Sequence, residues 1–353
     1  MFNRLKKVFA VVMTACCILV FTACGDSKVI FTTGLGHDDV FKIENVRADR
    51  TEFLIFLTNI ANKYEQVYGE ELWVLQEEDG TTMLDKCKRL ALAQLAQVKA
   101  MKLLAEENEV ALTKEEEALA QTAALQYMGT LSADEKEALG IKEDGVISQL
   151  YCEKLLADKL YAYLIRDVNP EISDDEARII TVQHILLKTY TIDENGNHQE
   201  LDAAARSKIL EKAEEIREEA LDGESFDTLI SKYSEDSKST YSFGIGDMEE
   251  SFEQAAYAMA KDEISEVVHT SHGYHIIKCV STLDREQTDL NKEKLLVSRK
   301  QEVFGNTYNQ FIDTLKKQEN TELIDALSLL DSNSVDSAEF FSIYESELGG
   351  MFD

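Results

Sequence analysis

The spacing of apolar residues in the first half of the chain is that of amphipathic helices. After Thr51, a suitable helix cap, apolar side chains recur every three or four positions: Phe53, Phe56, Leu57, Ile60 and Tyr64. The same spacing continues over about 82–107, 113–127 and 144–166. The pattern therefore predicts a helical lobe over residues 44–168.

Two later segments have the composition of β-strands instead. Val182–Leu187 and His272–Lys278 are rich in β-branched and aliphatic residues, and each carries a histidine of interest. Side chains alternate between the two faces of a strand, so His184 and His275 each lie on one defined face. If the two strands pair, the sequence predicts that their imidazoles meet across the ladder.

Three motifs follow one another between these strands: Ser225–Asp236, Phe243–Tyr257 and Asp262–Val268. Together with the histidine strands, their order resembles the parvulin family of peptidyl-prolyl isomerases. The resemblance implies an α+β fold, in which a parvulin-like antiparallel sheet with helices at 171–283 is inserted in a mostly α-helical, chaperone-like lobe. It also implies that the reaction needs no cofactor and no metal.

Matching the motifs residue by residue assigns candidate roles in a parvulin-like site. The resemblance implies that three side chains are catalytic: His184, Asp236 and His275. It implies that four more bind the substrate in and around an apolar proline pocket: Met248, Phe252, Phe243 and His272.

One connection departs from the family pattern. Only Ser-Lys-Ser-Thr-Tyr-Ser joins Asp236 to Phe243, whereas parvulins usually have a Gly-Gly-Asp-Leu-Gly segment here, and about Thr240 replaces a leucine of the pocket wall. The shortening leaves open whether Asp236 still lies beside the histidines. It also leaves open whether the histidines catalyse isomerisation or only brace each other inside the sheet.

Isomerisation of an X–Pro bond needs few catalytic groups. The barrier of about 20 kcal/mol comes from lost amide resonance, so the catalyst needs a dry pocket and a polar field for the twisted amide. The sequence contains neither Gly-x-Ser-x-Gly nor His-Glu-x-x-His, which argues against a hydrolase. Two functions remain. One is an isomerase for unfolded or partly folded exported proteins that contain proline, and the other is a weakly active or inactive holdase that binds such clients through its helical lobe.

The first 23 residues have the pattern of a bacterial secretory signal. Basic residues precede an apolar run over 8–21, which ends in Phe-Thr-Ala-Cys-Gly. This ending resembles a lipobox and implies that Cys24 carries lipid and anchors the protein on the outer face of the cell membrane. With the parvulin-like domain, the arrangement resembles extracytoplasmic foldase lipoproteins of the PrsA and SurA type. The alternative is an ordinary signal peptide cleaved near Ala23.

Charge and cysteine usage restrict the partners further. The formal net charge of −31 argues against nucleic acid, whose binding requires clustered lysine and arginine. Some parvulins bind phosphoserine or phosphothreonine through basic residues in this loop. Residues 189–205 contain no lysine or arginine, so the sequence does not support such binding here. The cysteines beyond the signal lack motif spacing, so neither a disulfide nor a metal site is predicted: Cys87, Cys152 and Cys279.

Domain boundaries follow from breaks in these patterns. Residues 24–43 are expected to form a tether or small hairpin, and Pro170 marks the start of the parvulin-like domain. After this domain, an amphipathic helix within 284–325 is expected to pack on the helical lobe, since a small domain cannot cover its apolar stripe alone. An acidic flexible tail is expected over 326–353. The sequence leaves a homodimer open.

Overall fold

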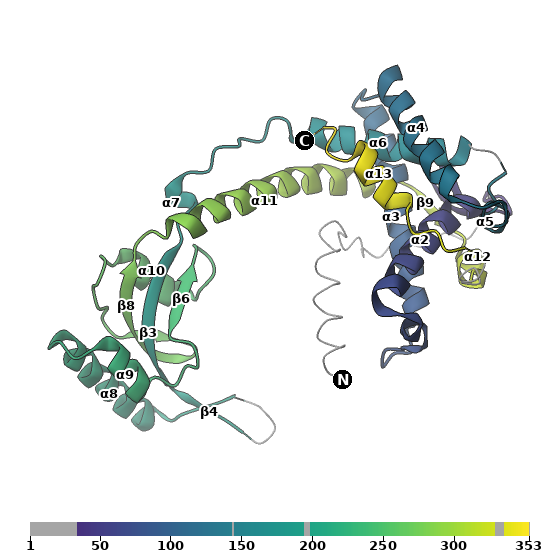
Figure 1. Cartoon of the computed structure of the whole chain (residues 1–353). Helices are drawn as coiled ribbons and strands as arrows, with labels where there is room; N and C mark the ends of the chain where they lie inside the picture. Colours follow the sequence, from purple (N-terminus) through teal and green to yellow (C-terminus); the bar gives the residue numbers. More distant parts are fainter. Residues whose placement is uncertain (1–33, 143–144, 194–197, 329–334, 353) are drawn as a thin grey trace. The chain divides into compact units, whose positions relative to one another are not determined.

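The chain is divided into two compact units. The computed structural model describes residues 34–142, 145–193, 198–328 and 335–352 (Figure 1). Met1–Asp167 and Val303–Asp353 form the first, which we call the helical unit, and Val168–Glu302 form the second, the sheet unit. Both contain helices and antiparallel strands, so the α+β class predicted from the sequence is confirmed. No helix within the described residues is long and apolar enough to cross a membrane.

The helical unit is built from long helices and one small sheet. Its elements before the sheet unit are β1 Asp39–Ile43, β2 Val46–Asp49, α2 Arg50–Tyr68, the short helix η1 Glu70–Val74, α3 Met83–Glu107, α4 Lys114–Thr130, α5 Ala133–Leu139 and α6 Gly145–Ile165. Those after it are β9 Lys317–Glu319, α12 Thr321–Ala326 and α13 Phe340–Leu348. The three-stranded sheet has the order β2-β1-β9, so it joins a segment before the sheet unit to one after it.

The start of this unit differs from the sequence prediction in two details. The strand at Asp39–Ile43 is not part of a hairpin confined to 24–43, because its partners are β2 and β9; residues 24–33 lie outside the described residues. Helix α2 is capped by Asp49 instead of Thr51. The Asp49 carboxylate accepts the N–H of Glu52, and the Glu52 carboxylate accepts the N–H of Asp49, which satisfies two helix-end donors at once.

The C-terminal segment is not the flexible tail expected over 326–353. Helix α13 buries Phe340, Tyr344 and Leu348 in the core of the helical unit. The backbone before it is fixed as well, because the Asn62 amide donates to two of its carbonyl oxygens and the Asn59 side chain accepts the N–H of Phe340. Burial of large aromatic rings outweighs the acidic composition that suggested disorder.

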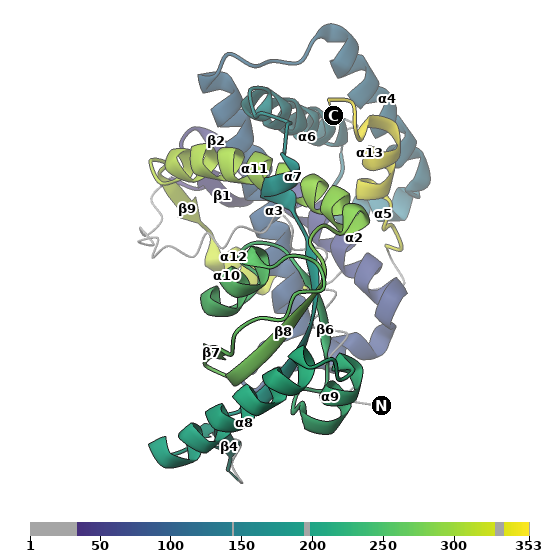
Figure 2. The ribbon, with the colours of Figure 1, turned by 90° about the vertical axis from the view of Figure 1, so that its left-hand side faces the viewer.

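The sheet unit contains the elements expected of a small α+β domain. They are α7 Asp174–Ala177, β3 Ile180–Lys188, β4 Tyr190–Ile192, β5 His198–Glu200, α8 Ala203–Leu221, α9 Phe226–Tyr233, β6 Thr240–Phe243, α10 Glu250–Ala258, β7 Val268–Thr270 and β8 Gly273–Ser281. The main sheet has the order β6-β3-β8-β7, and β4 and β5 form a separate two-stranded ribbon. Helix α10 packs on one face of the main sheet, and α8 and α9 pack on the other (Figure 2).

Helix α11, Arg285–Ile312, takes part in both units, which corrects the boundary expected at 284. Its first half is bound to the sheet unit, where the fully buried Thr288 accepts the N–H of Ile179 through its hydroxyl. Its last turns bury Phe304, Tyr308 and Ile312 against α3 and α6 of the helical unit. Only the end of the apolar stripe therefore covers the helical unit.

Candidate active site

Two neighbouring strands bring a pair of histidines together inside the sheet unit. In the antiparallel ladder of β3 and β8, His184 pairs with Ile277 and Leu186 pairs with His275, so both histidines lie on the face covered by α10. Their Nδ1 atoms are 3.1 Å apart, and the two residues are only 3% and 5% exposed. The predicted meeting of the two imidazoles is confirmed.

Gly273 allows β8 to begin close beside β3. Its φ of +139° lies in the region that side-chain-bearing residues avoid. A Cβ atom here would lie 2.2 Å from the carbonyl oxygen of Leu187, on the neighbouring strand. Only glycine fits, so this residue helps to set the register that brings His275 to His184.

The short connection after α9 still places Asp236 beside the histidines, which answers the question that the sequence left open. The segment is fastened along β3, because Glu235 N–H donates to the Leu186 carbonyl and the Ser239 carbonyl accepts the N–H of His184. The Asp236 Oδ2 atom lies 3.1 Å from His184 Nε2. Backbone pairing with β3 therefore compensates for the lost loop residues.

The site is a continuous row of hydrogen bonds. A carboxylate only accepts, so the Nε2–H of His184 donates to Asp236. With both rings neutral, the Nδ1–H of His275 then donates to the Nδ1 of His184. The remaining acceptor, Nε2 of His275, lies 2.8 Å from the hydroxyl of Thr270, which donates to it. Every ring nitrogen has a partner, so the tautomer and orientation of both imidazoles are fixed.

Burial and neighbouring charges set the protonation of this row. Burial lowers the pKa of His275 to about 4, and the neighbouring His184 and His272 add to the effect. Burial alone would raise the pKa of Asp236, but the backbone N–H of Lys238, the Tyr241 hydroxyl and His184 hold it below its ordinary value. At neutral pH the row therefore contains an uncharged His275 and an ionised Asp236.

A cavity of about 490 Å³ opens onto this row. Met248 and Phe252 line it together with both histidines and Asp236, as the resemblance implied. The Phe252 ring meets His275 and His184 edge to face, with centroid distances of 5.1 and 5.7 Å. The cavity therefore presents an apolar surface directly beside two fixed dipoles.

The two other residues expected to bind substrate lie in different positions. Phe243 is not among the lining residues, which corrects its expected role: it is buried behind Phe252, with ring centroids 5.9 Å apart, and supports that ring from the core. His272 does line the cavity and is largely exposed, with Nε2 3.5 Å from a carboxylate oxygen of Glu249. Thr240 begins β6 and is exposed, outside the set of lining residues.

Sequence reasoning missed two members of the site, Tyr241 and Thr270. Tyr241 takes the place of the missing pocket wall: its ring meets His184 at 5.2 Å and its hydroxyl donates to Asp236 at 2.9 Å. Burial and this hydrogen bond raise the pKa of Tyr241 to about 12. A signal for Tyr241 was present, since it is the one aromatic residue in the short connection. Thr270 had no local signal because it depends on the hairpin between β7 and β8.

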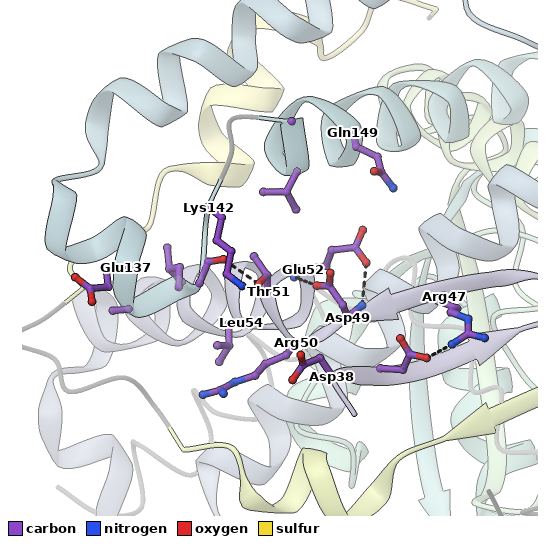
Figure 3. Close-up of a pocket in the computed structure, with 16 residues that line it drawn as sticks. Asp38, Arg47, Asp49, Arg50, Thr51, Glu52, Leu54, Glu137, Lys142 and Gln149 are labelled. Atoms are coloured by element: carbon purple, nitrogen blue, oxygen red, sulfur yellow. Dashed lines mark hydrogen bonds and ion pairs between the residues drawn. The ribbon is translucent and has the colours of Figure 1, made fainter. Parts of the chain in front are cut away.

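A second cavity, of about 900 Å³, lies in the helical unit (Figure 3). Acidic and basic side chains line it together: Asp38, Asp39, Asp49, Glu52, Glu137, Arg47, Arg50 and Lys142. Arg47 forms an ion pair with Asp39 in this lining, which Figure 3 marks with a dashed line at Arg47. Among its described lining residues there is no histidine or cysteine, so the sheet unit remains the candidate for chemistry.

The match to a family model and the similarity in sequence to known proteins agree with this site. Residues 184–281 match the family model described as the PPIC-type PPIASE domain. Foldase protein PrsA 3 of Bacillus cereus is 26% identical over 322 residues, which cover 88% of this chain and 92% of that protein. Foldase protein PrsA of Clostridium acetobutylicum is 25% identical over 71% of this chain and 76% of its own length. A crystal structure of peptidylprolyl isomerase PrsA from Bacillus cereus matches 77% of this chain and 98% of its own chain, at 21% identity and a TM-score of 0.35.

The sheet unit is therefore a peptidyl-prolyl cis-trans isomerase domain of the parvulin type. Over most of its length, the chain is a relative of the foldase proteins named PrsA. Cys24, the expected lipidation site, lies outside the described residues.

Proposed function

We propose that this protein is a lipid-anchored foldase outside the bacterial cell membrane that isomerises X–Pro bonds in exported proteins. One observation carries the proposal: the hydrogen-bonded row from Thr270 through both histidines to Asp236 opens into the same cavity as Met248 and Phe252. A proline ring and its amide need an apolar surface and a fixed polar field side by side.

The chemistry of this site follows from the reaction. As an X–Pro bond rotates, conjugation is lost and charge returns from the carbonyl oxygen to the nitrogen. Imidazoles whose orientation is already fixed stabilise this redistribution without reorganising, which favours the twisted amide over the planar one. We assign electrostatic roles to His184 and His275. No covalent bond is made or broken.

The surrounding residues hold these groups in place. Asp236 and Thr270 fix the two ends of the row, and Tyr241 fixes Asp236. Phe252 and Met248 receive the proline ring. We assign His272 to the rim of the cavity, where it contacts a bound segment beside the proline.

A refolding experiment tests this function. The full chain should accelerate the slow, proline-limited refolding phase of an unfolded secretory protein, because this phase otherwise takes tens to hundreds of seconds. A client whose refolding has no proline-limited phase serves as the control and should be unaffected. If neither client folds faster at equimolar foldase, the proposal fails.

The anchoring rests on the signal pattern and Cys24. Cys24→Ser should release the protein into the medium or leave the precursor unprocessed. Mass spectrometry of the wild-type protein should find diacylglycerol on an N-terminal Cys24. An unmodified N-terminus at another residue would contradict the anchor and leave the isomerase proposal untouched.

A second candidate function is favoured by apolar side chains on the surface of the helical unit. Val67 and Val74 are 67% and 81% exposed. On α4, Leu119 and Leu125 are 50% and 60% exposed. Such side chains can hold unfolded segments without catalysis. A Val67→Ser/Val74→Ser variant should then suppress client aggregation less well than the wild type. Unchanged suppression would argue against this surface.

A further inference from the structure

We infer that two copies of this protein associate through the exposed face of α4, with the two helices antiparallel and Thr122 of each copy at the two-fold axis. The inference does not depend on the proposed isomerase function. It concerns a surface of the helical unit, and the partner is a second copy of the chain.

Helix α4 has one buried face and one exposed face. It packs on α6 and α13 with five buried residues: Ala120, Ala123, Ala124, Tyr127 and Met128. At 100° per residue, the opposite side of the helix, which we call the outer face, holds six exposed residues: Ala118, Leu119, Thr122, Leu125, Gln126 and Gly129. Figures 1 and 2 both show α4 at the outer edge of the helical unit, which leaves this face open in the described part of the chain.

The outer face carries no charge. Residues 118–130 contain no aspartate, glutamate, lysine or arginine, although 29% of the whole chain is charged. Leu119 and Leu125 are 50% and 60% exposed within this stretch. Two chains with a formal net charge of −31 repel each other, and the repulsion is weakest where both surfaces lack carboxylates. The outer face is therefore a place where two copies can approach and bury apolar side chains.

The order of residues on this face makes it complementary to itself. Residues 119–125 read Leu-Ala-Gln-Thr-Ala-Ala-Leu, so Leu119 and Leu125 lie three positions before and after Thr122. On the helix they flank Thr122 by about 60° on either side. An antiparallel pair with its two-fold axis at Thr122 therefore brings Leu119 of each copy level with Leu125 of the other. A symmetric interface requires this correspondence, because one patch must match itself.

The centre of the face can be buried without leaving a polar group unpaired. The Thr122 hydroxyl donates to the Ala118 carbonyl at 2.8 Å within α4, so it needs no partner from a second copy. No heavy atom lies within 4 Å of the position that a Cβ atom would take at Gly129. Small residues at the contact allow two helix axes to come close together. The face therefore suits a packed helix better than a loosely held one.

Sedimentation equilibrium of the full chain tests the association. A Cys24→Ser background keeps the protein unanchored and removes one free thiol. A single helix pair is a small interface, so we expect a reversible dimer with a micromolar dissociation constant. Leu119→Glu places a carboxylate in each half of the pair and should raise this constant at least tenfold. Leu221→Glu on α8, which is also 50% exposed, is the matched control and should leave the constant unchanged. A wild type that stays monomeric, or equal constants in both variants, would overturn the inference.

Disulfide formation in the same background tests the register. Thr122→Cys places the same side chain of both copies together at the two-fold axis, so oxidation should link them into a covalent dimer. Thr130→Cys is exposed on the same helix, but the antiparallel pair separates its two copies by about 24 Å along the axis, so it should not be linked. No linking of Thr122→Cys would contradict the arrangement. Equal linking of both variants would also contradict it, since a parallel pair gives that result.

The other candidate occupant of the outer face is an unfolded client. If the wild type is monomeric and Leu119→Glu weakens its suppression of client aggregation, the face binds clients and the inference is overturned. Leu119→Glu should also isomerise a proline tetrapeptide as fast as the wild type, because α4 lies outside the sheet unit. A dimeric wild type that isomerises no peptide would reject the proposed function and still support the α4 interface.

Discussion

Both units bury a cluster of polar side chains, but the two clusters use their hydrogen bonds differently. In the sheet unit, His184 and His275 form a row that opens into a cavity. In the helical unit, Lys99 is fully buried between Glu52 and Glu153, with N–O distances of 2.5 and 2.7 Å. One cluster is a row of fixed dipoles beside a cavity. In the other, Lys99 is enclosed by its own carboxylate partners, of which Glu52 also lines the second cavity.

The charged cluster of the helical unit is saturated by its own partners. Burial alone would lower the pKa of Lys99, but the two carboxylates raise it above its ordinary value. Glu153 also accepts hydrogen bonds from Lys102 and Gln149. The comparison shows that burial of polar groups does not by itself mark a functional site, because the access of a ligand to those groups decides their use.

Removing Lys99 from the charged cluster should have the largest effect on the unfolding free energy. Lys99→Met leaves two buried carboxylates without their shared cation, so we expect the helical unit to lose about 3–5 kcal/mol of unfolding free energy. Urea denaturation measures the loss. The matched control is Lys102→Met, which removes a partly exposed partner of the same Glu153 and should cost less than about 1 kcal/mol. Equal costs for the two variants would contradict the buried cluster.

Removing a core ring from α13 should have a similar effect in the same unit. Phe340 is fully buried among aromatic rings, so Phe340→Ala should cost about 3–5 kcal/mol. The neighbouring Phe341 is only partly buried, so Phe341→Ala is the control and should cost clearly less. If Phe340→Ala leaves the denaturation midpoint unchanged, the C-terminal segment is a tail after all.

The unfolding free energy should depend on pH through His275, which gives a third test of the comparison. The unfolded chain binds a proton near pH 6.5 and the folded chain only near pH 4. The unfolding free energy is therefore at its full value above about pH 6.5 and falls by roughly 3 kcal/mol as the pH drops to about 4. His275→Gln should flatten this dependence, while His269→Gln, at an exposed histidine of β7, should keep it. Identical pH dependence in all three proteins would contradict the lowered pKa of His275.

The smallest of these effects concerns the apolar part of the cavity. Phe252→Ala removes most of the surface that we assign to the proline ring and should lower kcat/KM tenfold to hundredfold, equivalent to about 1–3 kcal/mol. Phe243→Leu changes the supporting ring, which does not line the cavity, and should have a smaller effect. A larger loss in Phe243→Leu would mean that packing, and not contact with substrate, dominates.

Much of the sheet unit could be predicted because its signals are local. Each histidine lies in a short apolar strand, and alternation alone places His184 and His275 on defined faces. The helices of the N-terminal half were also predictable from apolar spacing, with α3 and α6 close to their expected ranges. Local patterns contain enough information for these elements.

The remaining features depend on contacts between distant residues. Asn59 and Phe340 are 281 positions apart, and no periodic pattern connects them. Composition was misleading here, because acidic residues surround the aromatic ones that α13 buries. The position of Asp236 was also beyond the sequence, since it depends on pairing of the 235–239 segment with β3.

The most direct test of the account compares His184→Ala/His275→Ala with the wild type and with His269→Ala, which removes an imidazole outside the cavity. The measurement is isomerisation of a proline tetrapeptide by the full chain, with folding checked by circular dichroism. The account predicts that the double variant stays folded and loses on the order of a hundredfold in rate, since both fixed dipoles are gone, while His269→Ala keeps its rate. A folded double variant that isomerises the peptide as fast as the wild type would contradict the catalytic role of the histidine pair.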